Sequence, residues 1–431
     1  MNIVNFFKNK SVINSIWMML EKIISMFGLI FVMSLVAKYI GPDNFGRLTY
    51  ASSIFFIVQI LAMFGLDGII FQKTSRNKIQ GERIIALTMN LRNIIYVPTS
   101  ILALLFIYFY TDYLTFIYAI CTAVGGYFLL HDVYSIYFNA LLMSYINVIY
   151  NSVGLVIALI LRYIIVKLNF DIEYLGIPII VVSLIPYLIK RKIYNHSKAK
   201  NLLGSNLKHR YQNAVFSIGK KMVLYSVSVA IFLKTSQIIL GYFSKHDLGI
   251  YTVSITLGTS YYFVLLAIIT SFMPEIYNEK NERKINFLVA RLNVIVIIIS
   301  FFAFIGFSIF GKWIILNLYG DLYAEALPIT LIMIIVCMFS GLSTVVDKFL
   351  LKYNSYSFLM KKTNVLMFFN IFISFVSIYL YGLVGAVLSI LLVEFLSATF
   401  MNYFFKKVNF LEIHKSLFSI QFYKKILKDQ L

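Results

Sequence analysis

Long apolar runs separated by short polar segments fill the chain from end to end. Each run holds about 20 residues, the length that a helix needs to cross a hydrocarbon core of roughly 30 Å. A backbone in lipid must satisfy its own hydrogen bonds, which a helix does internally. The pattern predicts twelve spanning helices, near residues 15–40, 48–66, 85–109, 113–131, 147–167, 174–190, 218–241, 247–274, 286–311, 326–346, 363–382 and 384–405.

Composition excludes a soluble protein of ordinary makeup. The 431 residues are 60% hydrophobic and only 13% charged, so polar side chains are too few to cover several soluble domains. We therefore expect an all-α, polytopic transmembrane fold. Two predicted divisions rest on very short breaks, at 110–112 and at Gly382.

A polar, basic stretch from Lys190 to Lys221 divides the spans into two sets of six. The halves also echo each other weakly, because a shift of 203 places Gly46 on Gly249. Inverted or parallel duplications of this kind are common in transporters, with the pathway between the halves. The predicted domains are an N-terminal six-helix lobe, a basic cytoplasmic linker, a C-terminal six-helix lobe and a basic cytoplasmic tail, at 1–190, 191–217, 218–405 and 406–431.

Positive charge predicts the orientation, because cytoplasmic loops carry the excess of Lys and Arg. Of the 38 Lys and Arg residues, 28 fall in one set of loops and termini and seven on the opposite side. An even number of spans then places both termini in the cytoplasm. The net charge of +20 is dispersed between apolar spans, which favours contact with anionic lipid headgroups over nucleic-acid binding. The first apolar run is too long for a cleavable signal and is expected to remain as a span.

Several short segments carry a resemblance to a known family. The most specific runs from Ala37 to Ala51 (AKYIGPDNFGRLTYA) and is followed by Leu61–Asp67 (LAMFGLD). Weaker matches are Leu240–Phe243, Gly249–Tyr251, Pro274 and Tyr381–Ala386. With these segments the chain resembles the Wzx-type O-antigen/polysaccharide repeat-unit flippases of the multidrug/oligosaccharidyl-lipid/polysaccharide exporter (MOP) superfamily. It departs from them at His131–Tyr137, which lacks the basic residues often found there.

The resemblance implies a MATE-like fold of two six-helix lobes around a central cavity. It implies a flippase that moves an undecaprenyl-diphosphate-linked oligosaccharide, for O-antigen or capsule, across the bacterial inner membrane by alternating access. Implied partners are that lipid-linked oligosaccharide, membrane lipids, a polysaccharide polymerase and a chain-length regulator. No nucleic acid and no cofactor are expected.

Charges inside apolar spans are functional candidates because burying them is costly. A diphosphate needs cationic partners, which makes Arg92, Lys234, Lys220 and Lys22 candidates for a cationic cavity. Lys220 and Lys234 share a helical face, since fourteen residues is close to four turns. Lys22 and Lys220 can equally extend to lipid headgroups.

Two carboxylates are candidates for ion coupling, Glu394 and Glu21. Glu394 lies near the centre of the last span and can also be a protonated structural group. Glu21 shares a helical face with Asn14, Trp17 and Ser25, and can instead neutralise a neighbouring cation.

Other chemistry has little support. Cys121 and Cys337 sit inside apolar runs, and no histidine has metal-ligand spacing. Residues 306–312 resemble the start of a phosphate loop, but Trp313 replaces the required Ser or Thr. We therefore expect no enzyme and no ATPase, with transport driven by an ion gradient or by consumption of the product outside. The alternatives are a MATE-like drug or cation antiporter, a membrane-embedded glycan polymerase or ligase, and a non-transport scaffold.

Overall fold

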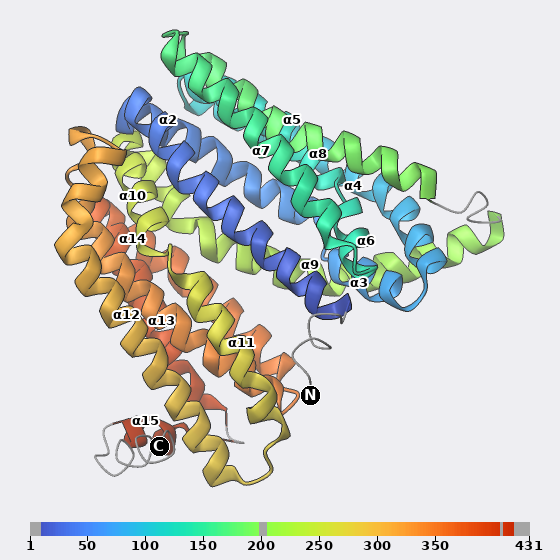
Figure 1. Ribbon diagram of the computed structural model, residues 1–431, viewed down its shortest axis with the longest axis vertical. Helices are drawn as coiled ribbons and strands as arrows, with labels where there is room; N and C mark the ends of the chain where they lie inside the picture. Colours follow the sequence, from blue (N-terminus) through green and yellow to red (C-terminus); the bar gives the residue numbers. More distant parts are fainter. Residues whose placement is uncertain (1–9, 198–204, 406–407, 418–431) are drawn as a thin grey trace. The chain divides into compact units, whose positions relative to one another are not determined.

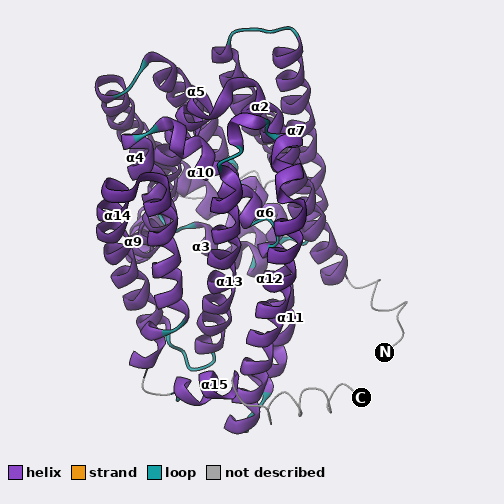
Figure 2. Cartoon of the chain, turned by 90° about the vertical axis from the view of Figure 1, so that its left-hand side faces the viewer, coloured by secondary structure: helices purple, strands orange, loops and turns teal. Residues whose placement is uncertain are grey.

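The computed structural model describes residues 10–197, 205–405 and 408–417. Every regular element in these ranges is helical, as Figure 2 shows. The chain separates into two compact units, 1–234 and 235–431. The predicted lobes, linker and tail stay predictions, and most of the tail lies outside the described residues.

The first unit begins with a long helix, α2, that is broken in its middle. At Gly41 the backbone has φ 73° and ψ 171°, a conformation that glycine adopts without the steric penalty of a Cβ. Pro42 follows, and its fixed φ suits the first turn of the next helix. The first two spans are therefore joined directly. The helices of this unit are α2 (Lys10–Met63), α3 (Asp67–Arg76), α4 (Lys78–Tyr110), α5 (Tyr113–His131), α6 (Tyr134–Ala140), α7 (Ser144–Lys167), η1 (Ile172–Leu175), α8 (Gly176–Ser197) and α9 (Ser205–Phe243), which continues into the second unit.

Small residues allow the spans of the first unit to approach closely. Helix α8 packs against both α5 and α7, and α2 also packs against α5 and α7 (Figure 1). A Cβ added to Gly154 of α7 would lie 2.7 Å from the Pro186 ring of α8, closer than van der Waals contact allows. Such close packing is how helices associate in lipid, where apolar burial contributes little.

In the second unit, α13 contacts α10, α11, α12 and α14. Helix α14 breaks at Gly382, where φ is 54° and ψ is −128°, so the chain reverses direction with almost no loop. The elements are α10 (Lys245–Gly258), α11 (Tyr262–Asn278), α12 (Glu282–Leu318), η2 (Asp321–Tyr323), α13 (Ala326–Leu351), α14 (Tyr356–Ala398), η3 (Phe400–Phe404) and α15 (Phe410–Leu417).

The helices agree with the predicted number of spans. Within the described residues nine helices are long and apolar enough to cross a membrane, or ten when the bent pair α10 and α11 counts as one span. Dividing α2 at Gly41 and α14 at Gly382 turns these ten into the twelve predicted from hydropathy. The break predicted at 110–112 is also present, because α4 ends at Tyr110 and α5 begins at Tyr113.

Large apolar side chains are exposed along the outside of the spans. Phe302, Phe368 and Phe372 are each about two-thirds exposed. A soluble protein rarely exposes so much contiguous apolar surface, whereas lipid solvates it. The chain is a multi-pass membrane protein.

The turn between α4 and α5 is fixed by Asp112, which caps α5. Its carboxylate accepts hydrogen bonds from the backbone N–H of Thr115 at 3.2 Å and from the Thr115 hydroxyl at 2.8 Å. Arg47 Nε lies 2.9 Å from Asp112 Oδ2 and ties the turn to α2. Partial burial opposes ionisation, but the Thr115 hydrogen bonds and the Arg47 charge together hold the pKa of Asp112 below its usual range.

The turn between α11 and α12 contains a carboxylate, Glu279, that should make the stability of the protein depend on pH. Glu279 accepts hydrogen bonds from the backbone N–H groups of Asn281 and Lys280 and from the Lys284 ammonium, which lower its pKa from 4.5 to about 2. A carboxylate with a depressed pKa stabilises the fold above its unfolded value, and that contribution is lost as pH falls through the folded value. Between pH 4.5 and 2, the melting temperature of the wild type should therefore fall further than that of Glu279→Gln, measured in detergent. Parallel curves for the two proteins would contradict this assignment.

Candidate functional site

Arg92 is a buried cation held by two partners in the first unit. It lies on α4 with 1% of its surface exposed. Its Nη2 is 2.5 Å from Asp67 Oδ1, and its Nη1 donates to the Leu130 carbonyl at the end of α5. Its Nε is buried and has no hydrogen-bond partner within the described part of the chain. The Nε–H of the guanidinium is therefore a donor that a ligand oxygen can accept from.

Asp67, the acidic partner of Arg92, is partly exposed. It opens α3, just after a tight turn in which Phe64 and Gly65 both have positive φ. The Asp67 side chain is 39% exposed, whereas its partner is buried. An acidic residue in the first turn is also stabilised by the helix dipole. The pair thus has one fixed member, Arg92, and one member that water or an anion can approach.

Lys234 has a different environment, inside the span formed by α9. Its ammonium lies 5.3 Å from the centre of the Phe56 ring of α2, within the range of a cation–π contact. Lys220 lies on the same face of α9 about 21 Å away along the helix axis, and its side chain is exposed. α9 therefore presents two cations in line, one exposed and one within the span.

The first unit also contains a buried lysine that was not among the predicted site residues. Lys190 of α8 is 0% exposed and forms an ion pair with Asp132 at the end of α5. Its ammonium also donates to Ser135 Oγ at 2.6 Å and to Asn151 Oδ1 at 2.9 Å. All three ammonium donors therefore have partners, as a buried charge requires.

The second unit contains a related group. Lys362 of α14 donates to Asp347 Oδ1 of α13 at 2.7 Å and to Asn402 Oδ1 of η3 at 3.0 Å. Lys362 is 4% exposed and Asn402 is fully buried. The predicted coupling residue Glu394 is buried on α14.

The predicted site residues Arg92, Lys234 and Glu394 each have different neighbours in the structure. Arg92 lies beside Asp67 and Leu130, Lys234 beside Phe56, and Glu394 in the second unit. The side chains of Glu21 and Lys22 lie outside what the structure describes. Asn14, on the predicted polar face of the first span, accepts a hydrogen bond from the Ser144 backbone N–H at 2.8 Å, which ties α2 to the start of α7.

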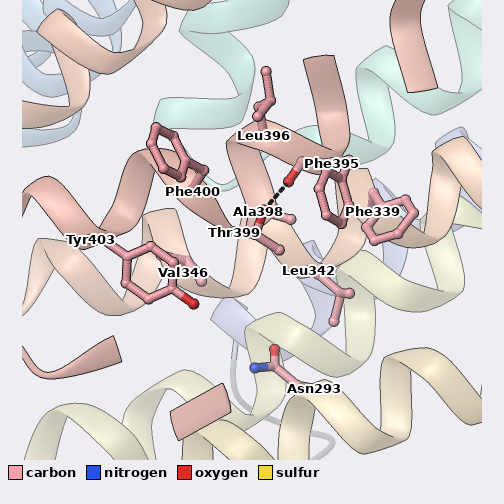
Figure 3. A pocket seen from close by; sticks show the side chains of 10 residues that line it. All are labelled: Asn293, Phe339, Leu342, Val346, Phe395, Leu396, Ala398, Thr399, Phe400 and Tyr403. Atoms are coloured by element: carbon pink, nitrogen blue, oxygen red, sulfur yellow. Dashed lines mark hydrogen bonds between the residues drawn. The ribbon is translucent and has the colours of Figure 1, made fainter. Parts of the chain in front are cut away.

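One cavity of about 540 Å³ lies within the second unit (Figure 3). Its wall is mainly aromatic and aliphatic, with Asn293 as a polar side chain at one side. The Oδ1 atom of Asn293 is buried and has no hydrogen-bond partner among the residues that the structure describes. The lining comes from α12, α13, α14 and η3 and includes none of the predicted site residues: Asn293, Phe339, Leu342, Val346, Phe395, Leu396, Ala398, Thr399, Phe400 and Tyr403. Among the described residues, no group of three or more His, Cys, Asp or Glu side chains is placed to hold a metal ion.

The helix order and the broken spans define a fold that solved membrane transporters share. The structure is similar to "Lipid II flippase MurJ, inward closed conformation", with a TM-score of 0.72, 14% identity, and coverage of 97% of this chain and 93% of the other. It is also similar to an inward-facing multidrug resistance MATE family transporter of the MOP superfamily, with a TM-score of 0.71, 12% identity, and coverage of 88% and 94%.

The chain belongs to the polysaccharide biosynthesis protein family, whose model matches residues 35–328. That match covers more than half of the sequence and includes Arg92, Lys190 and Lys234. No curated protein matches the chain.

Proposed function

We propose that this protein is a flippase for an undecaprenyl-diphosphate-linked oligosaccharide repeat unit, O-antigen or capsule, in the bacterial inner membrane with both termini in the cytoplasm. Membership of a polysaccharide biosynthesis family and the fold shared with a lipid II flippase support the class of cargo. The observation that supports it most is the sign of the charges on the predicted spans, because Arg92 of α4 and Lys234 of α9 are cations on spans of the first unit.

The proposed cargo carries two phosphates. Their negative charge needs successive cationic side chains along the route by which the headgroup crosses the membrane. Arg92 lies at the level of Asp67, which follows the end of the second span. Lys234 lies nine residues before the C-terminal end of α9 at Phe243, which is about 13 Å along the helix axis. In our proposal the Asp67 carboxylate pairs with the Arg92 guanidinium when cargo is absent. The diphosphate of the cargo then displaces the carboxylate from Arg92. Lys220 and Lys22 are proposed to contribute near the cytoplasmic entrance, the lobes to alternate around a central cavity, and Glu394 and Glu21 to couple the movement to an ion gradient.

Removing the charge of Lys234 or Arg92 should lower export. Lys234→Gln and Arg92→Gln each remove a charge-assisted contact worth about 1.5–3 kcal/mol, which corresponds to a rate about tenfold lower or more. The measurement is surface polysaccharide in a flippase-deficient strain that makes the cognate lipid-linked glycan, with protein level in the membrane measured in parallel.

A matched control is available on α7. Lys167 also lies over an aromatic ring, with its ammonium 5.7 Å from the centre of Tyr163, but it is in the last turn of its helix. Lys167→Gln should leave export unchanged, and Lys234→Arg should retain most of it. Normal surface polysaccharide from both Lys234→Gln and Arg92→Gln, at normal protein level, would refute the cationic path.

The same fold occurs in multidrug resistance transporters, so an antiporter is the second candidate. An antiporter would depend on an acidic group, and Glu394 is a buried carboxylate of the second unit. Drug resistance conferred on a sensitive strain and lost in Glu394→Gln, with no effect on surface polysaccharide, would favour that function over the flippase.

A further inference from the structure

The two buried lysines described above belong to groups that occupy corresponding places in the two units. We call Asp132, Asn151 and Lys190 the first clasp, and Asp347, Lys362 and Asn402 the second clasp. Each clasp joins the last three spans of its six-span set. The spans are α5, α7 and α8 in the first unit, and α13 and the two parts of α14, with η3, in the second.

The correspondence extends to the order and spacing of the side chains. In both clasps an aspartate at the end of the first of these three spans comes first in the chain. The amide and the ammonium follow on the next two spans, 39 residues apart in the first clasp and 40 in the second. In both, one ammonium bridges one carboxylate and one carboxamide oxygen.

The lysine and the asparagine exchange positions between the clasps. In the first, the middle span supplies Asn151 and the last span Lys190, which is 58 residues from its aspartate. In the second, the middle span supplies Lys362, only 15 residues from its aspartate, and the last segment supplies Asn402. In both clasps the ammonium is the buried charge, and the carboxylate that pairs with it is 9% exposed at Asp132 and 43% exposed at Asp347. One carboxylate can pair with an ammonium at either position, whereas two ammonium groups or none leave a charge uncompensated.

We propose that the two clasps are equivalent devices of an internally duplicated protein, each fixing the same ends of the last three spans of its unit through one carboxylate, one ammonium and one carboxamide. The ammonium can stand at either of the last two positions. This inference does not depend on the cargo. It makes Asp132, Asn151 and Lys190, and their counterparts, positioning residues that hold spans in register.

The test exchanges the two side chains within a clasp. Lys190→Asn alone should raise amide hydrogen exchange at the clasp end of α8 by about tenfold or more, the effect of losing a buried charge-assisted hydrogen bond. The double variant Asn151→Lys with Lys190→Asn should restore slow exchange there, since it recreates the arrangement of the second clasp. The counterpart pair is Lys362→Asn, and Lys362→Asn with Asn402→Lys.

Hydrogen exchange followed by mass spectrometry separates this role from general stability, because the change should be confined to peptides at the clasp ends and spare the opposite ends of the same helices. Each double variant has the same side-chain composition as the natural clasp. Its hydrogen exchange can therefore be compared with that of the wild type even if a single variant does not accumulate. Rescue of exchange in both units supports equivalence. Double variants that behave like the single variants, in either unit, overturn it, whatever the result of the transport assay.

Discussion

Replacing Lys190 by methionine is expected to destabilise the first unit by about 3–5 kcal/mol. Methionine keeps most of the side-chain volume but removes the ammonium, so Asp132, whose side chain is only 9% exposed, keeps a buried charge without its cation. Asn151 and Ser135 lose their common donor as well. The measurement is denaturant unfolding of purified protein in a mild detergent, with the yield of monodisperse protein as a second readout.

Two controls make this prediction specific. Lys192→Met, two residues away on an exposed part of α8, should change stability by less than about 0.5 kcal/mol. Asp132→Leu combined with Lys190→Met should recover much of the loss, because removing both charges also removes the cost of desolvating them. If Lys190→Met unfolds at the same denaturant concentration as Lys192→Met, the ion pair does not stabilise the unit.

Gly385→Val is expected to prevent the second unit from closing correctly. A Cβ at Gly385 would lie 1.9 Å from the carbonyl oxygen of Ser377, which is backbone and cannot turn aside. The two parts of α14 would have to separate next to the reversal at Gly382. Overpacking usually costs about 1–3 kcal/mol, and a backbone clash this short belongs at or above the upper end.

Gly306 offers the matched control, because a Cβ there would meet nothing within 4 Å. Gly306→Ala replaces a glycine inside α12 and should be neutral or stabilising by up to about 1 kcal/mol. Unfolding midpoints and membrane protein levels of the two variants can be compared directly. Equal stability for Gly385→Val and Gly306→Ala would show that the α14 reversal relaxes easily.

Hydropathy predicted the spans because the requirement it measures is local. A run of apolar residues reports that lipid surrounds a helix, whatever the helix contacts. Even the shortest breaks were readable: Asp112 is a typical helix N-cap, and Gly382 tolerates the positive φ of a reversal. A shift of 203 residues also relates the break at Gly41 to Ser244, where α9 ends and α10 begins.

The ion pairs could not be read in the same way, because they join residues far apart in sequence. Counting positive charge treats every loop cation alike, so Lys190 and Lys362 were counted among the charges that set topology, yet both are buried. Asp67 likewise looks like a residue at a span end, and only the fold shows that it meets Arg92. Aspartates at 132 and 347, each ending the fourth span of its half, were the signal available.

The lack of basic residues in His131–Tyr137 has a structural counterpart. This segment departs from the resembling family by lacking basic residues, and in the fold it supplies Asp132 and Ser135 to a lysine that comes from α8 instead. The cation was therefore present, but on a different helix. A comparison of loops one by one does not detect this, whereas a comparison of spatial groups does.

The breaks at Gly41 and Gly382 also determine what the protein presents outside the cell membrane. In the proposed orientation, α2 and α14 turn at that face with a single non-helical residue each, and the longer connections there, 168–175 and 319–325, are partly wound into η1 and η2. With such short connections on the outer face, antibodies, proteases and periplasmic proteins find little exposed chain to bind. In that orientation, the surfaces left for recognition by other macromolecules are mainly those in the membrane plane and on the cytoplasmic side.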